Sequence, residues 1–128
     1  MRVCLIGKNL TNFVLAKNLS NKNLYVDIIF EEKKKRSFSQ RTIGISNDNF
    51  NFLTNINNQP KIKAWPIKKI KIYSDKHNSK ELFEFKSKKV DNFFMLKHSY
   101  MLSYFENACK KSKYIKFKKV NYKKKKFF

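Results

Sequence analysis

The alternation of apolar and polar residues predicts three elements within the first thirty positions. Residues 3–6 form a short apolar run that ends at Gly7, a pattern typical of a strand buried on both faces in a parallel sheet. Across residues 10–21 the apolar side chains recur at helical spacing, and Asn9 is the expected N-cap. Residues 25–30 are a second β-rich run. Strand, helix and strand in this order predict a βαβ unit with a right-handed crossover.

Helical spacing returns twice further along the chain. Apolar residues at every third or fourth position predict a helix over residues 47–56, with Ser46 as its N-cap, and a second helix over residues 99–111. The polar stretches at residues 31–40 and 55–60 are expected to be loops.

A β-hairpin is predicted between the two later helices. Residues 67–74 and 82–86 alternate in polarity, and the turn-forming residues 75–79 separate them. A last strand is predicted over residues 114–120, followed by a basic tail at 121–128.

Composition favours a folded domain and leaves the meaning of the charge open. The 128 residues are 41% apolar and include 13 Phe and 6 Tyr, which argues against intrinsic disorder. The net charge of +21 suggests contact with nucleic acid or an anionic membrane. Only 3 Arg accompany the 27 Lys, however, although Arg is the residue that most often binds phosphate. The 27 Lys and 15 Asn have A/T-rich codons, which points to codon bias as the source of the positive charge. Codon bias and selection for a polyanion are both open explanations.

Cysteine usage and hydropathy indicate a cytoplasmic chain. Cys4 and Cys109 lie far apart without a CxxC motif or nearby His, so we expect neither a disulfide framework nor a metal site. Both are expected to be small buried side chains. No signal peptide or apolar stretch of transmembrane length is present. The chain is expected to be free in the cytoplasm or peripheral to the inner membrane.

The βαβ unit holds the candidate chemistry. Dinucleotide-binding folds carry a G-x-G-x-x-G turn after the first strand and an acidic residue after the second. Here the turn reads Gly7-Lys8-Asn9-Leu10-Thr11-Asn12, and Glu31 follows 24 residues after the glycine. Asn tolerates a left-handed backbone, so the turn can form, but the side chains of Asn9 and Asn12 would crowd a pyrophosphate and the strand–helix contact. A βαβ crossover that binds nothing is the alternative.

Three later segments resemble a known family. Residues 41–46, Arg-Thr-Ile-Gly-Ile-Ser, resemble its R-x-[IL]-[AG]-[LI]-S segment, and residues 65–75 resemble its P-I-x-x-I-x-V-x-D strand. Residues 93–96 and the helix after them resemble the stretch that returns to the flavin domain. Order and spacing over about residues 1–120 resemble the FAD-dependent aromatic-ring hydroxylases (flavoprotein monooxygenases) of the ubiquinone-biosynthesis type.

The resemblance implies roles for several residues in binding FAD. Glu31 would hold the adenosine ribose, and Arg41 would lie against the flavin nucleotide. The helix start at Lys97 and His98 would lie near the isoalloxazine ring, where the family usually shows Asn or Gln. The alternatives are a solvated strand end for Glu31, a surface ion pair for Arg41 and an exposed helix terminus for His98.

The resemblance also implies an incomplete flavin site. The family's Asp-Gly motif and its G-D-A-x-H segment have no counterpart in this sequence. FAD binding is therefore expected to be weak or lost, no catalytic residue is assigned, and a complementing chain carrying the missing half is the expected partner. In the complete enzymes the flavin carries out the difficult chemistry.

These observations predict an incomplete α/β fold with a Rossmann-like FAD-binding βαβ start and part of an adjoining β-rich substrate region. Residues 1–60 would form the nucleotide-binding segment and residues 61–96 a β-hairpin part of the substrate region. Residues 97–120 would return to the first domain, ahead of the basic tail at 121–128. The alternative functions are a small basic module that binds RNA or an anionic membrane nonspecifically, and a structural remnant without a ligand.

Overall fold

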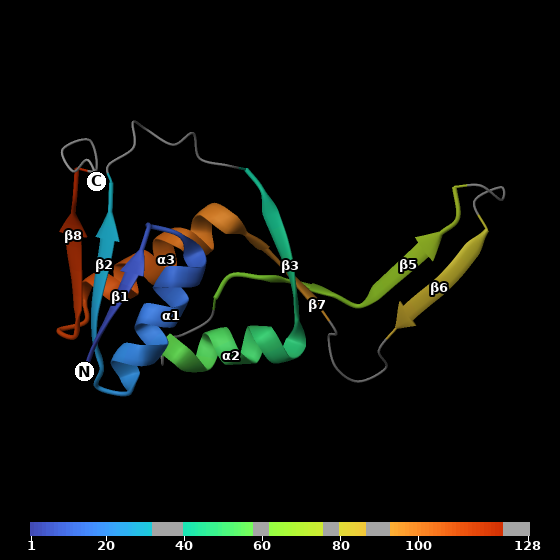
Figure 1. Ribbon diagram of the computed structural model, residues 1–128. Coiled ribbons are helices and arrows are strands. Elements are labelled where there is room, and N and C mark those ends of the chain that lie inside the picture. The colour runs from blue at the N-terminus through green and yellow to red at the C-terminus, as the bar shows by residue number, and fades with distance from the viewer. Residues whose placement is uncertain (32–39, 58–61, 76–79, 87–92, 122–128) are drawn as a thin grey trace.

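The computed structural model describes residues 1–31, 40–57, 62–75, 80–86 and 93–121 (Figure 1). Its elements are, in chain order, β1 (Arg2–Ile6), α1 (Leu10–Asn21), β2 (Tyr25–Phe30), β3 (Thr42–Ser46), α2 (Asn47–Asn57), β4 (Trp65–Ile67), β5 (Lys69–Tyr73), β6 (Glu81–Lys86), β7 (Phe93–Lys97), α3 (His98–Lys110) and β8 (Ile115–Lys119). The predicted α/β class is confirmed. Most of the predicted loops, the 75–79 turn and the basic tail lie outside the described residues.

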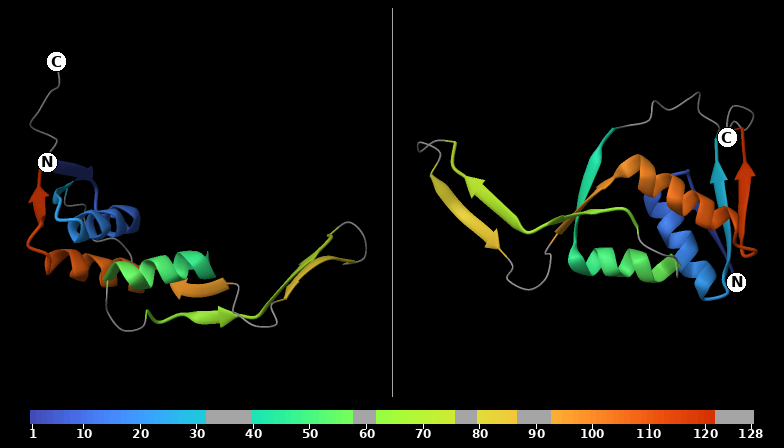
Figure 2. Two further views of the ribbon diagram at one scale, coloured as in Figure 1. Left: turned by 90° about the horizontal axis from the view of Figure 1, so that it is seen from below. Right: turned by 180° about the vertical axis from the view of Figure 1, so that it is seen from behind.

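A parallel sheet joins the two ends of the chain. Its strand order is β1-β2-β8, so the predicted last strand is confirmed and lies at a sheet edge. The pairing sets Val3 beside Val26, and Val26 beside Ile115. Helices α1 and α3 lie on the same side of this sheet (Figure 2, left). The side chains of Val26 and Ile28 are fully buried because they lie between the sheet and these helices.

Strand β1 corrects the prediction of a strand buried on both faces. Exposure alternates along it: Cys4 and Ile6 are exposed, whereas Val3 and Leu5 are partly buried. The reason is that β1 is an edge strand and the two helices cover only one face of the sheet. The expectation of a buried cysteine is accordingly wrong for Cys4 and confirmed for Cys109.

A second, antiparallel sheet has the order β3-β7-β4. Its inner face includes the fully buried Leu96 and the ring of Phe94, which stacks on Phe50 of α2 at 4.1 Å between centroids. The polarity pattern did not predict β3, because Gly44 interrupts a run of only five residues. The structure explains the glycine: a Cβ there would lie 3.3 Å from the sulfur of Met95 on the paired strand.

The two later helices lie where helical spacing predicted them. Helix α2 begins after Ser46, whose hydroxyl accepts a hydrogen bond from the backbone N–H of Asn49 at 3.3 Å. Helix α3 buries Met101, Phe105 and Cys109, which recur at every fourth position. Within the described residues no helix combines the length and apolar content needed to cross a membrane.

The predicted hairpin is confirmed as strands β5 and β6, which pair antiparallel. It extends away from the helices and the two other sheets (Figures 1 and 2). The core lies at the other end of the molecule, where Phe13 and Ala16 of α1 meet Phe105 of α3 without exposure to solvent.

Replacing Phe105 with Ala is expected to remove about 3–5 kcal/mol from the free energy of unfolding, because the substitution leaves a cavity in this core. The matched control Phe52→Ala, at a side chain that is 48% exposed, should cost no more than about 0.5 kcal/mol. Urea unfolding followed by circular dichroism measures both. Equal losses for the two variants would contradict the assigned core.

Candidate nucleotide-binding turn

The chain reverses direction between β1 and α1 at Gly7, whose φ of +100° is rarely adopted by L side chains. The backbone N–H of Gly7 donates to the carbonyl oxygen of Ile29 at 2.7 Å, which ties the turn to β2. The backbone at Asn9 is extended, with φ at −141°, and Asn12 lies within α1. The tolerance of Asn for a left-handed backbone is therefore not needed here, since a single glycine makes the turn.

The side chains of Asn9 and Asn12 fill this turn. The Oδ1 atom of Asn9 accepts from the backbone N–H of Asn12 at 2.9 Å, which confirms Asn9 as the N-cap. The Nδ2 atom of Asn12 donates to the carbonyl oxygens of Ile6 at 2.7 Å and Gly7 at 2.9 Å. A helix N-terminus attracts anions through unpaired N–H groups. Here the N–H of Asn12 is already paired, and two amide side chains lie against the turn.

A lysine lies across the carboxyl ends of β2 and β8. The ammonium of Lys8 is 4.0 Å from the ring centroid of Phe30, 5.7 Å from that of Phe117 and 3.5 Å from the carboxylate of Glu106. Desolvation favours the neutral form of Glu106, but the hydrogen bond from Lys110 and the charges of both lysines outweigh it and lower its pKa. Lys8 occupies an unrestricted position of the turn motif, so sequence reasoning had no signal for it.

Glu31 is exposed and directly follows β2. Because β1 and β2 are parallel, with Ile6 aligned to Ile29, their carboxyl ends meet at one edge of the sheet. The structure therefore brings Glu31 to the same edge as the turn at Gly7, as the motif spacing requires. Its role in holding a ribose stays a prediction.

Arg41 lies at the beginning of α3 although 57 residues separate it from His98. Its carbonyl oxygen accepts from the backbone N–H of His98 at 2.9 Å, and Thr42 pairs with Lys97 in the antiparallel sheet. The starts of β3 and α3 lie toward the upper side of the molecule in Figure 1, as do the carboxyl ends of β1 and β2. Arg41 is exposed, and a nucleotide contact by its guanidinium stays a prediction.

The uncovered face of the parallel sheet centres on Asp27, which is only 7% exposed. Its Oδ2 atom lies 2.6 Å from the ammonium of Lys118 on β8 and 3.5 Å from the guanidinium of Arg2 on β1. The hydrogen bond from Lys118 lowers the pKa of Asp27 in spite of desolvation, and the charge of Arg2 acts in the same direction. One carboxylate thus links all three strands on the face opposite the helices.

Several solved structures superpose on more than nine-tenths of this chain. The chain superposes on p-nitrophenol 4-monooxygenase from Pseudomonas putida DLL-E4 with a TM-score of 0.64 at 13% identity, covering 91% of this chain and 31% of that one. For 2,6-dihydroxypyridine-3-hydroxylase from Arthrobacter nicotinovorans the TM-score is 0.61 at 10% identity, with 91% and 28% covered. For the flavin-dependent monooxygenase PieE, solved with FAD and substrate, it is 0.64 at 9% identity, with 93% and 24% covered.

These likenesses show the fold, which matches the N-terminal part of FAD-dependent monooxygenases. The chain spans about a third or less of the length of each of these three proteins. No family model matches the sequence. A search of curated proteins likewise finds no matching sequence.

The Asp27 contacts should make stability fall in acid. A carboxylate whose pKa is lowered by folding stabilises the fold at neutral pH, and this contribution is lost as the pH falls from about 4 toward the folded-state pKa. Asp27→Asn is expected to unfold at lower temperature at pH 7 and to lose less stability between about pH 5 and 3. Thermal unfolding across this range tests it, with the exposed Asp75→Asn as control. Parallel pH profiles for wild type and Asp27→Asn would contradict the assignment.

Proposed function

We propose that this chain is a relative of the FAD-dependent monooxygenases, of the type that hydroxylates an aromatic ring in ubiquinone biosynthesis, and that it does not catalyse the reaction alone. The observation that carries the proposal is the placement of Glu31 at the sheet edge next to the Gly7 turn, in a fold that superposes on flavoenzymes over nine-tenths of the chain. The ring specificity rests on the segments at residues 41–46 and 65–75 that resemble the ubiquinone-type enzymes.

FAD would meet both favourable and unfavourable features at this turn. Glu31 supplies an acceptor for ribose hydroxyls, and Lys8 supplies a cation near the carboxyl ends of the strands. Against this, Asn9 and Asn12 occupy the turn and pair the helix N–H that a pyrophosphate would use. Binding is therefore weak or lost in the chain by itself.

A second polypeptide segment would complete the parallel sheet. Parallel strands are normally buried on both faces, whereas Cys4 and Ile6 of edge strand β1 are exposed, Ile6 to 71%. An unpaired strand edge is also a template for pairing. A chain that carries the Asp-Gly and G-D-A-x-H segments would add strands at an edge of this sheet, beside β1 or β8, and close the flavin site.

Titration with FAD tests the proposed nucleotide site. The wild-type chain should bind weakly or not at all, and Asn9→Gly/Asn12→Gly should bind at least about tenfold tighter, because glycines reopen the turn. An N-cap glycine at position 9 costs only a few tenths of a kcal/mol, and a glycine at position 12 within α1 costs about 1 kcal/mol. Asn51→Gly/Asn55→Gly, on an exposed part of α2, is the matched control and should leave affinity unchanged.

Either of two results would reject this account of the turn. One is a yellow wild-type preparation that keeps stoichiometric flavin through gel filtration. The other is a turn variant that folds, by circular dichroism, but binds FAD no better than wild type or the α2 control.

The second candidate function is nonspecific binding of a polyanion, favoured by the surface of β8. Lys116, Lys118 and Lys119 of β8 are exposed, with Lys118 also paired to Asp27, and the sequence beyond them is rich in lysine. Lysine ammoniums neutralise phosphates without reading bases.

RNA binding by this surface should weaken steeply with salt and ignore sequence. The logarithm of the association constant is expected to fall linearly with the logarithm of salt concentration, because binding releases counterions. Fluorescence anisotropy with several unrelated labelled RNAs measures both properties. Tight, sequence-selective binding at physiological salt would instead make nucleic-acid recognition the main function.

A further inference from the structure

A polar cavity lies where α1, the end of α2 and the last turns of α3 come together. Its volume is about 360 Å³, and the polar side chains that line it are Lys17, Asn57, Tyr104, Asn107, Lys111 and Ser112. Binding sites for small molecules usually have volumes of about 300–1,000 Å³. Because Ser112 lies just before β8 begins, the cavity lies toward the amino ends of the parallel strands, away from the Gly7 turn.

Helix packing brings the walls of this cavity together. Tyr104, Asn107 and Lys111 follow one another at three- and four-residue spacing, so they share one face of α3 and its C-cap. Helices α1 and α3 pack against each other in the core. The Nδ2 atom of Asn21 on α1 donates to the carbonyl oxygen of Ile56 at 2.5 Å, which ties the end of α2 to α1. The cavity is therefore part of the packed fold.

The side chains that line the cavity carry positive charge and no negative charge. Lys17 is half-buried, and its ammonium donates to the neutral amide oxygen of Asn21 at 2.9 Å. Among the described residues, neither Lys17 nor Lys111 forms an ion pair with a carboxylate. Glu106, the acidic residue in this part of α3, pairs with two other lysines. Two ammonium groups at the cavity are thus left without a counter-ion from the described part of the chain.

Hydrogen-bond donors are also available at the cavity. The hydroxyl oxygen of Tyr104 is excluded from solvent and has no hydrogen-bond partner within the described residues. Unpaired buried polar groups are rare and destabilise a fold. The hydroxyl of Ser112 accepts from the backbone N–H of Tyr114 at 3.4 Å, which leaves its own proton free to be donated. A ligand with several acceptor oxygens would satisfy both hydroxyls.

We propose that this cavity binds a small molecule that carries a phosphate group. The ammoniums of Lys17 and Lys111 neutralise the two charges of a phosphate monoester, and the hydroxyls of Tyr104 and Ser112 donate to its oxygens. Lysine binds phosphate as a point charge. The ring of Tyr104 and the methyl group of Ala108 supply an apolar wall for the carbon part of the ligand. The proposal does not depend on FAD binding, because the Gly7 turn lies at the other end of the sheet.

Inorganic phosphate is the probe, and isothermal titration calorimetry of the full chain at constant ionic strength measures its binding. One saturable site with a Kd of about 1 mM or tighter is expected, and acetate should bind at least about tenfold more weakly. Lys17→Gln and Lys111→Gln should each weaken phosphate binding by about tenfold, because each removes a charge-assisted contact. Lys22→Gln and Lys113→Gln are the matched controls. Both remove one exposed charge outside the lining and should leave the affinity unchanged.

Tyr104→Phe separates a binding role of the hydroxyl from a structural one. This variant should also weaken phosphate binding by about tenfold. Its thermal unfolding temperature without phosphate should not fall below that of the wild type, because the hydroxyl has no partner in the free chain. A variant that unfolds at lower temperature but binds phosphate as the wild type does would show a structural hydroxyl and contradict the assignment.

Three results would overturn the proposal, and circular dichroism establishes that each variant compared is folded. The first is a wild-type chain without a saturable phosphate site. The second is equal weakening by the cavity and control variants, which would indicate nonspecific attraction to a chain of charge +21. The third is displacement of phosphate by short single-stranded RNA whose binding depends equally on Lys17 and Lys111. That result would assign both lysines to a surface that binds the nucleic-acid backbone.

Discussion

The pairing of β2 with β1 on one side and β8 on the other is the constraint on which the remaining structure depends. It connects the first thirty residues to the last strand and sets Val26 and Ile28 beneath α1 and α3. The two helices are held together over it, with the thiol of Cys109 donating to the carbonyl oxygen of Phe13 at 3.2 Å. Burial raises the pKa of this thiol to about 12, so Cys109 acts as a packing residue. The helices cover only one face of this sheet.

The turn between β1 and α1 shows how a dinucleotide-type turn can form while side chains occupy the space around it. Gly7 alone supplies the left-handed backbone, so the later glycines of the motif are not needed for the chain to turn. Asn9 caps α1, and Asn12 pairs with the carbonyl oxygens of Ile6 and Gly7. Each of these hydrogen bonds stabilises the local structure. Under the proposed function, these same side chains stand where a phosphate of FAD would need open space and a free N–H group.

The sequence predicted the helices and strands whose apolar residues recur with regular spacing. It did not predict burial or side-chain contacts that depend on strands distant in the sequence. The βαβ unit, α2, α3 and the hairpin follow from spacing and caps that the chain carries locally. Whether β1 is buried depends on which strands lie beside it, so the exposure of Cys4 could not be read from an apolar run. The position of Lys8 over Phe30 and Phe117 likewise depends on β8, which is more than a hundred residues away. The motif spacing, by contrast, correctly predicted that Glu31 lies at the same edge of the sheet as the Gly7 turn.

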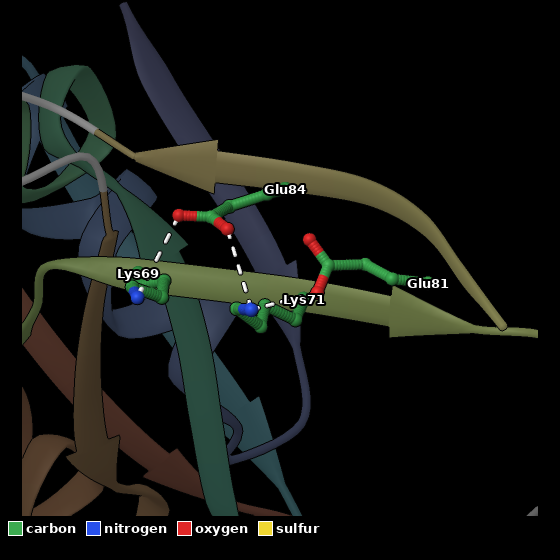
Figure 3. Close-up of polar contacts among 4 residues, drawn as sticks. All are labelled: Lys69, Lys71, Glu81 and Glu84. Atoms are coloured by element: carbon green, nitrogen blue, oxygen red, sulfur yellow. Dashed lines mark hydrogen bonds and ion pairs between the residues drawn. The ribbon is translucent and has the colours of Figure 1, made fainter. Parts of the chain in front are cut away.

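Among the described residues, two surfaces lack a covering layer: one face of the parallel sheet and the apolar face of the β5–β6 hairpin. On the uncovered face of the parallel sheet, Asp27 forms ion pairs with Lys118 and Arg2. The charged groups at the centre of that face therefore already have partners. On the hairpin the ion pairs between β5 and β6 lie on one face only (Figure 3), and exposed pairs contribute little stability. Its other face leaves Phe83 and Phe85 in solvent, and water cannot satisfy them. The hairpin is therefore the part of the described fold whose apolar side chains are least protected from water.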